Sequence, residues 1–276
     1  MPRYDLHSHS TASDGLLTPT ELVARAAGRR VDVLALTDHD EVAGLAEAES
    51  AAAAAGIVLI RGSELSVSWE GQTIHIVGLN IDPAHPVLAA GLELIRSSRA
   101  SRARKMADAL AAAGIRGAYE GALKYVTSER LISRTHFARY LVEIGRAREV
   151  KDVFSRYLVR GKPGYVPHAW ATLEQAVGWI VASGGDAVLA HPGRYKITRT
   201  KLRRLLEQFR DAGGVGIEVL SPSHTPAQCV DFVNLARAMS LRASCGSDFH
   251  GPGESWMDLG GLHPLPSGAQ PVWQTW

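Results

Sequence analysis

The sequence has few cysteines and no long apolar run, and both absences narrow the class of protein. Its 276 residues include only two cysteines, Cys229 and Cys245, which are too few for a disulfide framework or a thiolate zinc site. A reducing compartment, the cytoplasm, is therefore expected. No run approaches the roughly 20 apolar residues that cross a membrane, and residues 1–20 lack the apolar core of a signal peptide.

The motifs of two common cofactor-binding folds are also missing. No strand-like segment is followed by GxGxxG or by GxxxxGKS/T, so neither a dinucleotide-binding fold nor a P-loop fold is supported. No Ser-His-Asp or Cys-His set that requires a protein nucleophile is evident either. The chemistry has to come from other residue types.

Short apolar, β-branched segments alternate with segments of helical period. The strand-like segments are residues 3–9, 31–40, 57–69, 72–82, 186–194, 215–224 and 241–250. Helical segments at 18–29 and 172–185 each begin at a threonine that suits a helix N-cap. This alternation predicts an α/β architecture with parallel strands, and seven strands are compatible with a barrel.

Residues 96–162 break the pattern. They contain no clear strand, and they carry 16 lysines and arginines against 6 aspartates and glutamates, while the rest of the chain is net acidic. A solvated helical face is the simpler interpretation of such a charge run. The alternative is a basic insertion that attracts an anionic ligand.

Histidines and carboxylates collect where the predicted strands end. Six of the 11 histidines lie at or near these ends, nearly always beside a carboxylate: His7, His9, His39, His75, His191 and His250. In an α/β barrel these ends open onto one face, where catalytic residues gather. His7 and His9 are two residues apart on a strand, so both side chains point the same way.

One histidine in such a place is usually a hydrogen-bonded structural residue, and His85, His136, His168, His224 and His263 are open to that interpretation. The repeated combination of His, Asp and Glu without cysteine instead suits Mn, Fe or Zn. Carboxylates can bridge two ions, so several ions can share these ligands. We therefore predict a cluster of divalent ions, with Mn²⁺ favoured and Fe²⁺ and Zn²⁺ as alternatives.

Six segments together resemble the polymerase-and-histidinol-phosphatase (PHP) family of amidohydrolase-like barrels. They are HSHSTASDG (7–15), TDHD (37–40), GSELS (62–66), IHIVGL (74–79), AHPGR (190–194) and GSDFH (246–250). The resemblance covers nearly the whole chain. It implies a distorted (βα)7, TIM-like barrel formed by residues 1–95 and 163–276, with residues 96–162 as a helical insertion that covers the active site.

The resemblance also implies roles for individual residues. A first metal ion would take His7, His9, Glu64 and Asp248. A second would take Glu64, His75 and His191, with Glu64 shared between the two, and a third would take Asp14, His39 and His250. The candidate catalytic residues are Asp14, Asp38, His224 and His250. Among them, Asp38 would orient a ligand, and His224 or His250 would protonate the leaving oxygen.

The basic insertion suggests a substrate with two phosphates, one cleaved at the metals and the other held by arginines. The candidate substrate contacts are Arg134, Thr135, His136, Lys162, Arg194, Ser221 and His224. The segments SRTHFAR, GKPGYV and AHPGRY also resemble a PHP subgroup that includes a 3′,5′-nucleotide bisphosphate phosphatase and enzymes that trim short RNA from the 5′ end. The resemblance therefore implies pAp-like nucleotides and short 5′-phosphorylated RNA as substrates.

Two alternatives remain open from the sequence. A histidinol-phosphate phosphatase would use the same barrel, but a substrate with one phosphate and a cationic tail gains little from a basic insertion. A non-catalytic RNA-binding module would keep the barrel and hold little metal. No membrane association and no obligate protein partner is expected.

Overall fold

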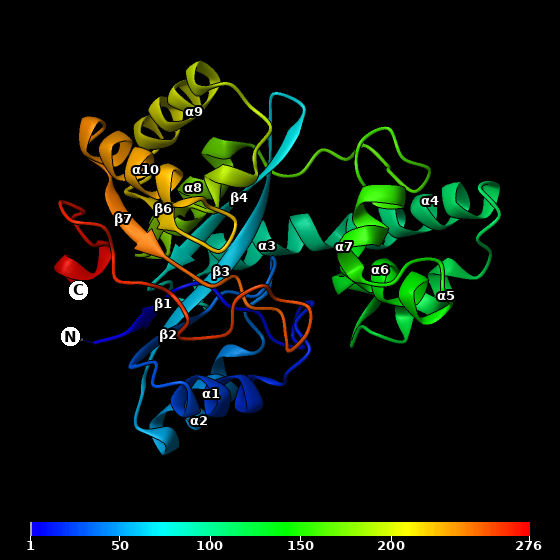
Figure 1. Ribbon diagram of the computed structural model, residues 1–276, viewed down its shortest axis with the longest axis horizontal. Coiled ribbons are helices and arrows are strands. Elements are labelled where there is room, and N and C mark those ends of the chain that lie inside the picture. The colour runs from blue at the N-terminus through cyan, green and yellow to red at the C-terminus, as the bar shows by residue number, and fades with distance from the viewer. Residues whose placement is uncertain (1) are drawn as a thin grey trace.

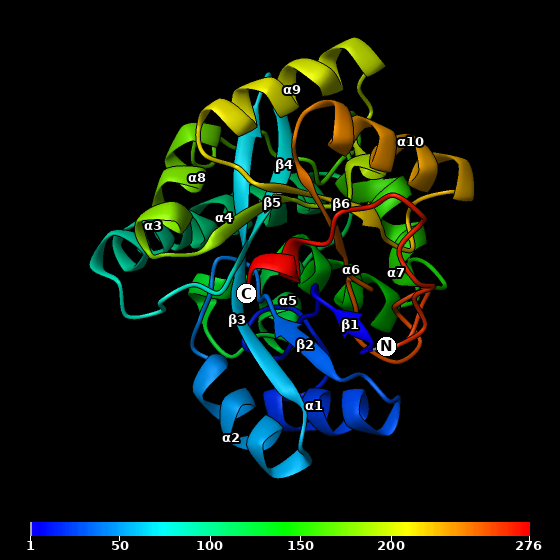
Figure 2. The same cartoon turned by 90° about the vertical axis from the view of Figure 1, so that its left-hand side faces the viewer.

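The computed structural model describes residues 2–276, and its centre is a seven-stranded sheet rolled into a barrel (Figure 1; Figure 2). The strands are β1 (Tyr4–Asp5), β2 (Val33–Leu36), β3 (Val58–Trp69), β4 (Gln72–Leu79), β5 (Asp186–Leu189), β6 (Gly216–Leu220) and β7 (Arg242–Cys245). They pair in chain order from β1 to β7. The predicted α/β barrel is therefore confirmed.

Backbone hydrogen bonds join the segments that follow β1 and β7. Asp248 N donates to His7 O at 2.9 Å, and His9 N donates to Phe249 O at 2.9 Å. The main chain thus holds three of the expected metal ligands side by side at the place where the barrel closes.

Strand β4 corrects the expectation that the strands are all parallel. It runs antiparallel to β3 and to β5. Trp69 pairs with Gln72, which leaves Glu70 and Gly71 as a two-residue turn with φ angles of 44° and 72°, as tight hairpins require. Because of this reversal, the N-terminal half of β4, which carries His75, lies at the same rim as the C-terminal ends of the other strands.

Helices cover the outside of the barrel (Figure 2). They are α1 (Pro19–Gly28), α2 (Leu45–Ala55), α3 (Pro86–Ser97), α8 (Leu173–Ala182), α9 (Arg199–Asp211) and α10 (Pro226–Ala238). The helices expected after Thr18 and Thr172 are confirmed, and both threonines form capping boxes, with Glu21 and Gln175 respectively. The short helices η3 (Pro192–Arg194) and η4 (Val272–Thr275) complete this part of the chain.

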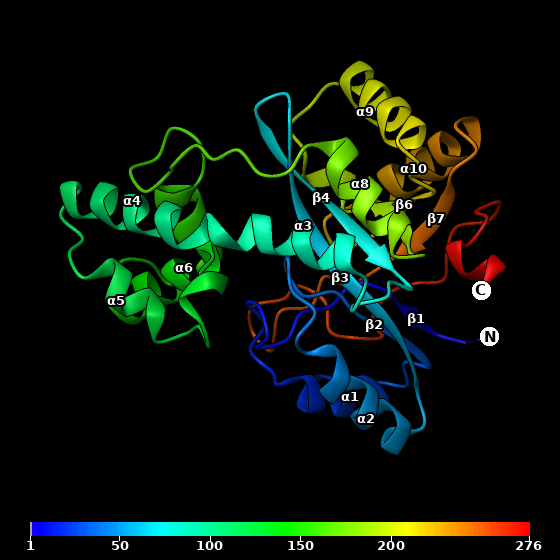
Figure 3. The same cartoon turned by 180° about the vertical axis from the view of Figure 1, so that it is seen from behind.

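Residues 99–158 form a helical unit at one side of the barrel (Figure 1; Figure 3). It consists of α4 (Arg99–Ala112), α5 (Ala118–Leu123), η1 (Glu129–Leu131), α6 (Arg134–Glu143), α7 (Val150–Val153) and the π-helical turn η2 (Phe154–Leu158). Its helices bury their own apolar cluster around Met106, Leu110, Phe137 and Leu158. Only Ser98 separates α3 from α4, so the insertion begins as a near-continuation of a barrel helix.

Within residues 2–276, no helix has the length and apolar character needed to pass through a bilayer. Cys229 and Cys245 are both buried and free.

Candidate active site

Glu64, fully buried in β3, lies at the centre of five histidines. Its Oε2 is 3.3 Å from His7 Nε2, 3.4 Å from His9 Nε2 and 2.9 Å from His39 Nδ1; its Oε1 is 2.9 Å from His75 Nδ1 and 3.0 Å from His191 Nε2. Burial by itself would raise the pKa of this carboxyl, but the surrounding imidazoles, led by His39 and His75, hold its pKa well below the usual range. Glu64 is therefore an ionised carboxylate with histidine nitrogens beside both of its oxygens.

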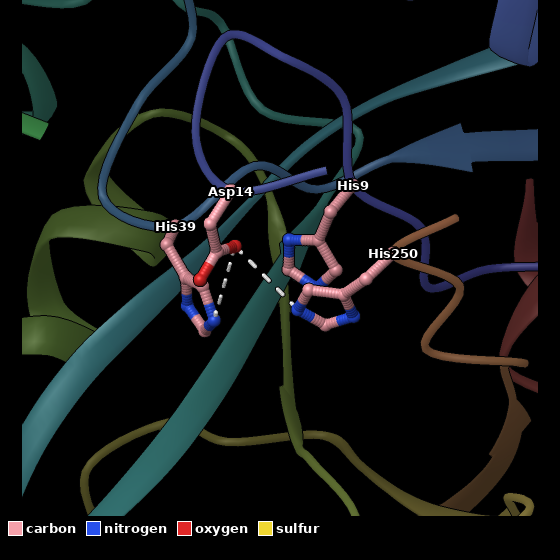
Figure 4. Close-up of side chains that lie close together, drawn as sticks. All are labelled: His9, Asp14, His39 and His250. Atoms are coloured by element: carbon pink, nitrogen blue, oxygen red, sulfur yellow. Dashed lines mark ion pairs between the residues drawn. The ribbon is translucent and has the colours of Figure 1, made fainter. Parts of the chain in front are cut away.

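A second group surrounds Asp14, on the loop after β1 (Figure 4). Asp14 Oδ1 lies 3.5 Å from His250 Nε2 and 3.9 Å from His39 Nε2. The ring of His9 stacks on that of His250, with centroids 4.1 Å apart. Asp14 Oδ2 accepts a hydrogen bond from Ser133 Oγ at 3.0 Å, so the insertion contacts this carboxylate directly.

These side chains fit divalent cations. Three sets place their nitrogen and oxygen atoms within 4.8 Å of one another: His7, His9, Glu64 and Asp248; His9, Asp14, His39 and His250; and His39, Glu64 and His75. Three polar atoms, His7 Nε2, Asp14 Oδ1 and Glu64 Oε2, are buried without a hydrogen-bond partner. Buried polar atoms are normally hydrogen-bonded, so a cluster of unpartnered ones that face each other suits ions. The structure therefore brings the nine expected ligands together.

Glu218 in β6 is a functional candidate that the sequence reasoning missed. It is buried, its Oε1 accepts from His7 Nδ1 at 2.7 Å, and its Oε2 accepts from His191 N at 2.6 Å. A carboxylate at Nδ1 keeps a proton on that nitrogen, so Nε2 is the nitrogen that His7 would offer to an ion in the cluster. The sequence signal for it is a single carboxylate within the otherwise apolar strand segment GIEVL (216–220).

Asp38 positions the loop that carries Asp14. Its carboxylate accepts from Ser10 N at 2.8 Å, Ser10 Oγ at 2.7 Å and Ser13 Oγ at 2.5 Å. Burial, the largest influence, raises the pKa of Asp38 to about 6 despite these hydrogen bonds. These hydrogen bonds hold the residue just before Asp14 and do not reach the ring of His39.

The cavity at the rim has a cationic half beside the histidine half. The guanidinium groups of Arg99 and Arg102 lie over Trp170 and that of Arg134 over Phe154, while Arg194 lies against Asp248 of the histidine half. The lining includes Asp14, His39, Glu64, His75, Arg99, Arg102, Ser133, Arg134, Thr135, Phe154, Trp170, His191, Arg194, Asp248 and His250. Arg99 and Arg102 were not among the expected contacts. Their three-residue spacing at the start of α4 places both on one helix face, and this was the missed signal.

The four arginines differ in their partners. Arg99 forms an ion pair with Asp40, and Arg194 forms one with Asp248. Within residues 2–276, neither Arg102 nor Arg134 has an acidic partner within ion-pair distance. Burial, followed by repulsion from Arg134 and Arg99, lowers the pKa of Arg102 to about 9. Crowded cations without counterions indicate a site for an anion.

Three predicted substrate contacts do not line this cavity. His136 is fully buried, and its Nδ1 accepts from Ser133 N at 3.0 Å. Lys162 is exposed on the surface of the insertion. Ser221 is buried, 3.2 Å from Ser223 Oγ. Arg134, Thr135 and Arg194 do line it.

His224, expected both to bind substrate and to act as an acid, is also absent from the lining. Its Nδ1 donates to Val219 O at 3.2 Å, and its Nε2 accepts from Gly193 N at 3.1 Å. Both ring nitrogens are therefore occupied by main-chain groups. This arrangement suits a structural histidine that holds the turn after β5.

Arg139 fastens the insertion to the barrel. Its guanidinium makes two 2.8 Å bonds to the carboxylate of Glu254, and Nη2 also donates to Asp14 O at 2.6 Å. Arg139 and Ser133 belong to the same helix, α6, for which Ser133 is the N-cap and Arg134 the first residue. The helix that carries a cavity arginine thus holds the Asp14 loop at two points.

Comparison with known proteins decides the family. The sequence model of the PHP domain matches residues 5–221. The chain belongs to the PHP domain family. The 3′,5′-nucleoside bisphosphate phosphatase of Chromobacterium violaceum is 54% identical over 274 residues, which are 99% of this chain and 96% of that relative. The 5′-3′ exoribonuclease Rnm of Salmonella typhimurium is 49% identical over 275 residues, 99% of this chain and 93% of that relative.

A solved structure agrees with the fold. It is described as an amidohydrolase from Chromobacterium violaceum with bound sulfate, and it has a TM-score of 0.96 at 54% identity, covering 98% of this chain and 94% of the other. The PHP family expected from the motifs is confirmed. Phosphoester hydrolysis, the class of reaction expected for this chain, agrees with the names of the relatives.

Proposed function

We propose that this protein is a metal-dependent phosphoesterase that removes the 3′-phosphate of 3′,5′-nucleoside bisphosphates, such as pAp, and releases 5′-mononucleotides from the 5′ end of short RNA. The observation that carries the proposal is one cavity with two anion-binding halves. The cavity is lined by a cluster of histidines and carboxylates and also by Arg102 and Arg134, which have no acidic partner within residues 2–276. The names of the relatives support the same substrates.

The proposed ligand sets are those that the resemblance to the PHP family implies. His7, His9, Glu64 and Asp248 would hold one ion; Glu64, His75 and His191 a second; and Asp14, His39 and His250 a third. The groups of neighbouring atoms support the first set, add His9 to the third, and have His39 rather than His191 with Glu64 and His75. Mn²⁺ is the proposed metal, with Fe²⁺ and Zn²⁺ as alternatives for this mixture of imidazoles and carboxylates. When bound, the ions supply Lewis-acid activation of water and neutralise charge on the phosphoryl oxygens.

The chain's own residues bind and orient the substrate. Arg102 and Arg134 hold the 5′-phosphate, because they are the cavity arginines without acidic partners in the described residues 2–276. Arg99 supports them from its ion pair with Asp40. Gripping this phosphate fixes the distance between it and the reacting 3′-phosphate, which lowers the entropy lost in reaching the transition state.

We assign proton transfer to the leaving 3′-oxygen to no side chain. His250 lines the cavity and its Nδ1 donates to Asp248 O at 2.9 Å, so its Nε2 is the atom that would bind the third ion and carries no proton for this step. His224 is not proposed for this role, because both of its ring nitrogens are bonded to main chain. Asp38 acts indirectly, by holding the loop of Asp14.

The experiment compares pAp with 3′-AMP, which lacks the 5′-phosphate, in the Mn²⁺-loaded protein. Arg134→Ala should lower kcat/KM for pAp by about tenfold to a hundredfold, the value of a charged hydrogen bond of about 1.5–3 kcal/mol, and leave 3′-AMP nearly unaffected. Arg160→Ala, at an exposed arginine outside the cavity, is the control. An equal loss on both substrates would remove Arg134 from the 5′-phosphate site.

The two free, buried cysteines support one further element of the proposal. We place the protein in a reducing compartment, the cytoplasm, where thiols of this kind persist.

A further inference from the structure

Trp256 is the most exposed large apolar side chain in the described part of the molecule, with 84% of its surface open to solvent. It lies on the loop that follows β7. Lys151 Nζ, at the start of α7, lies 5.0 Å from the centroid of its ring. An indole this exposed packs little against the rest of the protein and is typical of a binding surface.

The surroundings of Trp256 connect it to the rim of the candidate active site. The preceding residue, Ser255, accepts a hydrogen bond from His250 N at 2.7 Å, and His250 lines the cavity. Lys151, whose ammonium group lies over the same ring, is three residues before Phe154, which also lines the cavity. Figure 1 and Figure 2 both place the loop after β7 (orange) beside α7. Trp256 therefore lies outside the cavity, next to its edge.

The neighbouring segment 146–162 is basic and exposed. Its cations are Arg146, Arg148, Lys151, Arg156, Arg160 and Lys162, against the acids Glu149 and Asp152. All six cations are exposed, and across residues 2–276 none of them lies within ion-pair distance of an acid. Some other cations of the insertion are paired, as Arg104 is with Glu129 and Lys124 with Glu143. Segment 146–162 thus brings six free cations to the part of the insertion whose Lys151 lies against Trp256.

We propose that Trp256 and segment 146–162 bind the part of a single-stranded RNA that lies 3′ of the scissile phosphodiester. The inference rests on the proposed exoribonuclease activity. Aromatic side chains stack bases without regard to sequence, and nearby cations follow the backbone phosphates. A nucleoside bisphosphate ends at the reacting phosphate and has no nucleotide to place on this surface. The surface therefore distinguishes RNA from the mononucleotide substrate.

Trp256→Ala in the metal-loaded protein is the test, with pAp, a 5′-phosphorylated dinucleotide and a 5′-phosphorylated pentanucleotide as substrates. We expect kcat/KM for the pentanucleotide to fall about tenfold or more, with a smaller loss on the dinucleotide and pAp turnover unchanged. Trp276→Ala is the matched control, because Trp276 is exposed but bonded to Asp186 at the start of β5, at the opposite end of the barrel. It should leave all three substrates unaffected.

The charges are tested by the double variant Arg148→Ser/Lys151→Ser. The slope of log KM against log salt for the pentanucleotide should become shallower by about 0.7 for each RNA phosphate that the variant no longer neutralises. The inference is overturned if wild-type protein degrades the pentanucleotide and Trp256→Ala does so equally well, or if Trp256→Ala loses pAp turnover in the same proportion. Wild-type protein that hydrolyses pAp but not RNA would instead contradict the exoribonuclease half of the proposed function, and the inference with it.

Discussion

Replacing Arg102 by methionine should make the free protein more stable and its nucleotide site weaker. Arg102 is 9% exposed, its guanidinium carbon lies 5.2 Å from the ring centroid of Trp170, and its nearest charged neighbours in the cavity are arginines. Methionine keeps the contact with Trp170 and removes the charge. The substitution therefore separates the cost of crowding cations from the benefit they bring to an anion.

The magnitude follows from the pKa of Arg102, which burial and then Arg134 and Arg99 lower from 12.5 to about 9. A shift of about 3.5 units corresponds to about 5 kcal/mol. Water in the open cavity reduces this cost of burial and repulsion, so we expect a gain of about 1–2 kcal/mol in the free energy of unfolding. The folded protein carries the unfavourable charge at every pH below about 9. The gain should thus be constant near neutrality and shrink as the pH rises above that value.

Urea unfolding of the Mn²⁺-loaded protein measures both effects. AMP, the proposed product, carries only the phosphate that the arginines hold. At a concentration about 100 times its Kd, AMP should stabilise wild-type protein by about 2.7 kcal/mol. It should stabilise Arg102→Met by at least about 1 kcal/mol less, because a charged hydrogen bond is lost. Arg160→Met, at an exposed site, controls for removal of a charge.

The reasoning is refuted if Arg102→Met unfolds at the same or lower urea concentration than wild-type protein without nucleotide. It is also refuted if AMP stabilises both proteins equally. The first result would mean that the arginines do not repel one another in the free protein, and the second that they do not hold the 5′-phosphate.

Three further predictions concern the histidine cluster and its supports. Glu64→Gln removes the carboxylate shared by five histidines, so bound metal measured by mass spectrometry should fall to about one ion per chain or fewer, the ion of the Asp14 group; full loading would contradict the shared role. In Gly246→Ala the new Cβ would lie 2.2 Å from His7 Cβ, so urea unfolding should show a loss of about 1–3 kcal/mol together with reduced metal content. Gly28→Ala, where a Cβ meets nothing within 4 Å, should show neither effect. His224→Ala should keep kcat on pAp within about threefold while losing about 1–2 kcal/mol of stability for its two main-chain hydrogen bonds; a large fall in kcat with intact folding would return His224 to the reaction.

The histidine half of the site was predictable because its residues lie at strand ends. In a barrel, closure brings strand ends together whatever their separation in the chain, so the motifs around His7, His39, His191 and His250 needed only the correct fold. Strand β4 shows where that logic stops. Alternation of strands and helices predicts parallel neighbours, but the two-residue turn Glu70–Gly71 leaves no room for a helix and reverses the strand.

The arginine half was only partly predictable, since it depends on how the insertion docks. Net charge indicated that an anion binds, but it did not say which guanidinium groups face the cavity. Arg99 and Arg102 do so because α4 nearly continues α3, while Arg139, on the helix that begins with Arg134, is used in an ion pair with Glu254. His136 is the opposite case, a predicted substrate contact that does not face the cavity. It lies close to Arg134 in α6, but its side chain caps this helix.

The central claim is that this PHP protein hydrolyses phosphoesters while arginines hold a second phosphate. Purified protein with Mn²⁺ is incubated separately with pAp, histidinol phosphate and a short 5′-phosphorylated RNA, and free phosphate and nucleotides are followed by chromatography. We predict AMP from pAp and 5′-mononucleotides from the RNA, with histidinol phosphate nearly untouched. Turnover of histidinol phosphate as fast as pAp would contradict the two-phosphate account, and metal-loaded protein that hydrolyses none of the three would contradict the proposed function.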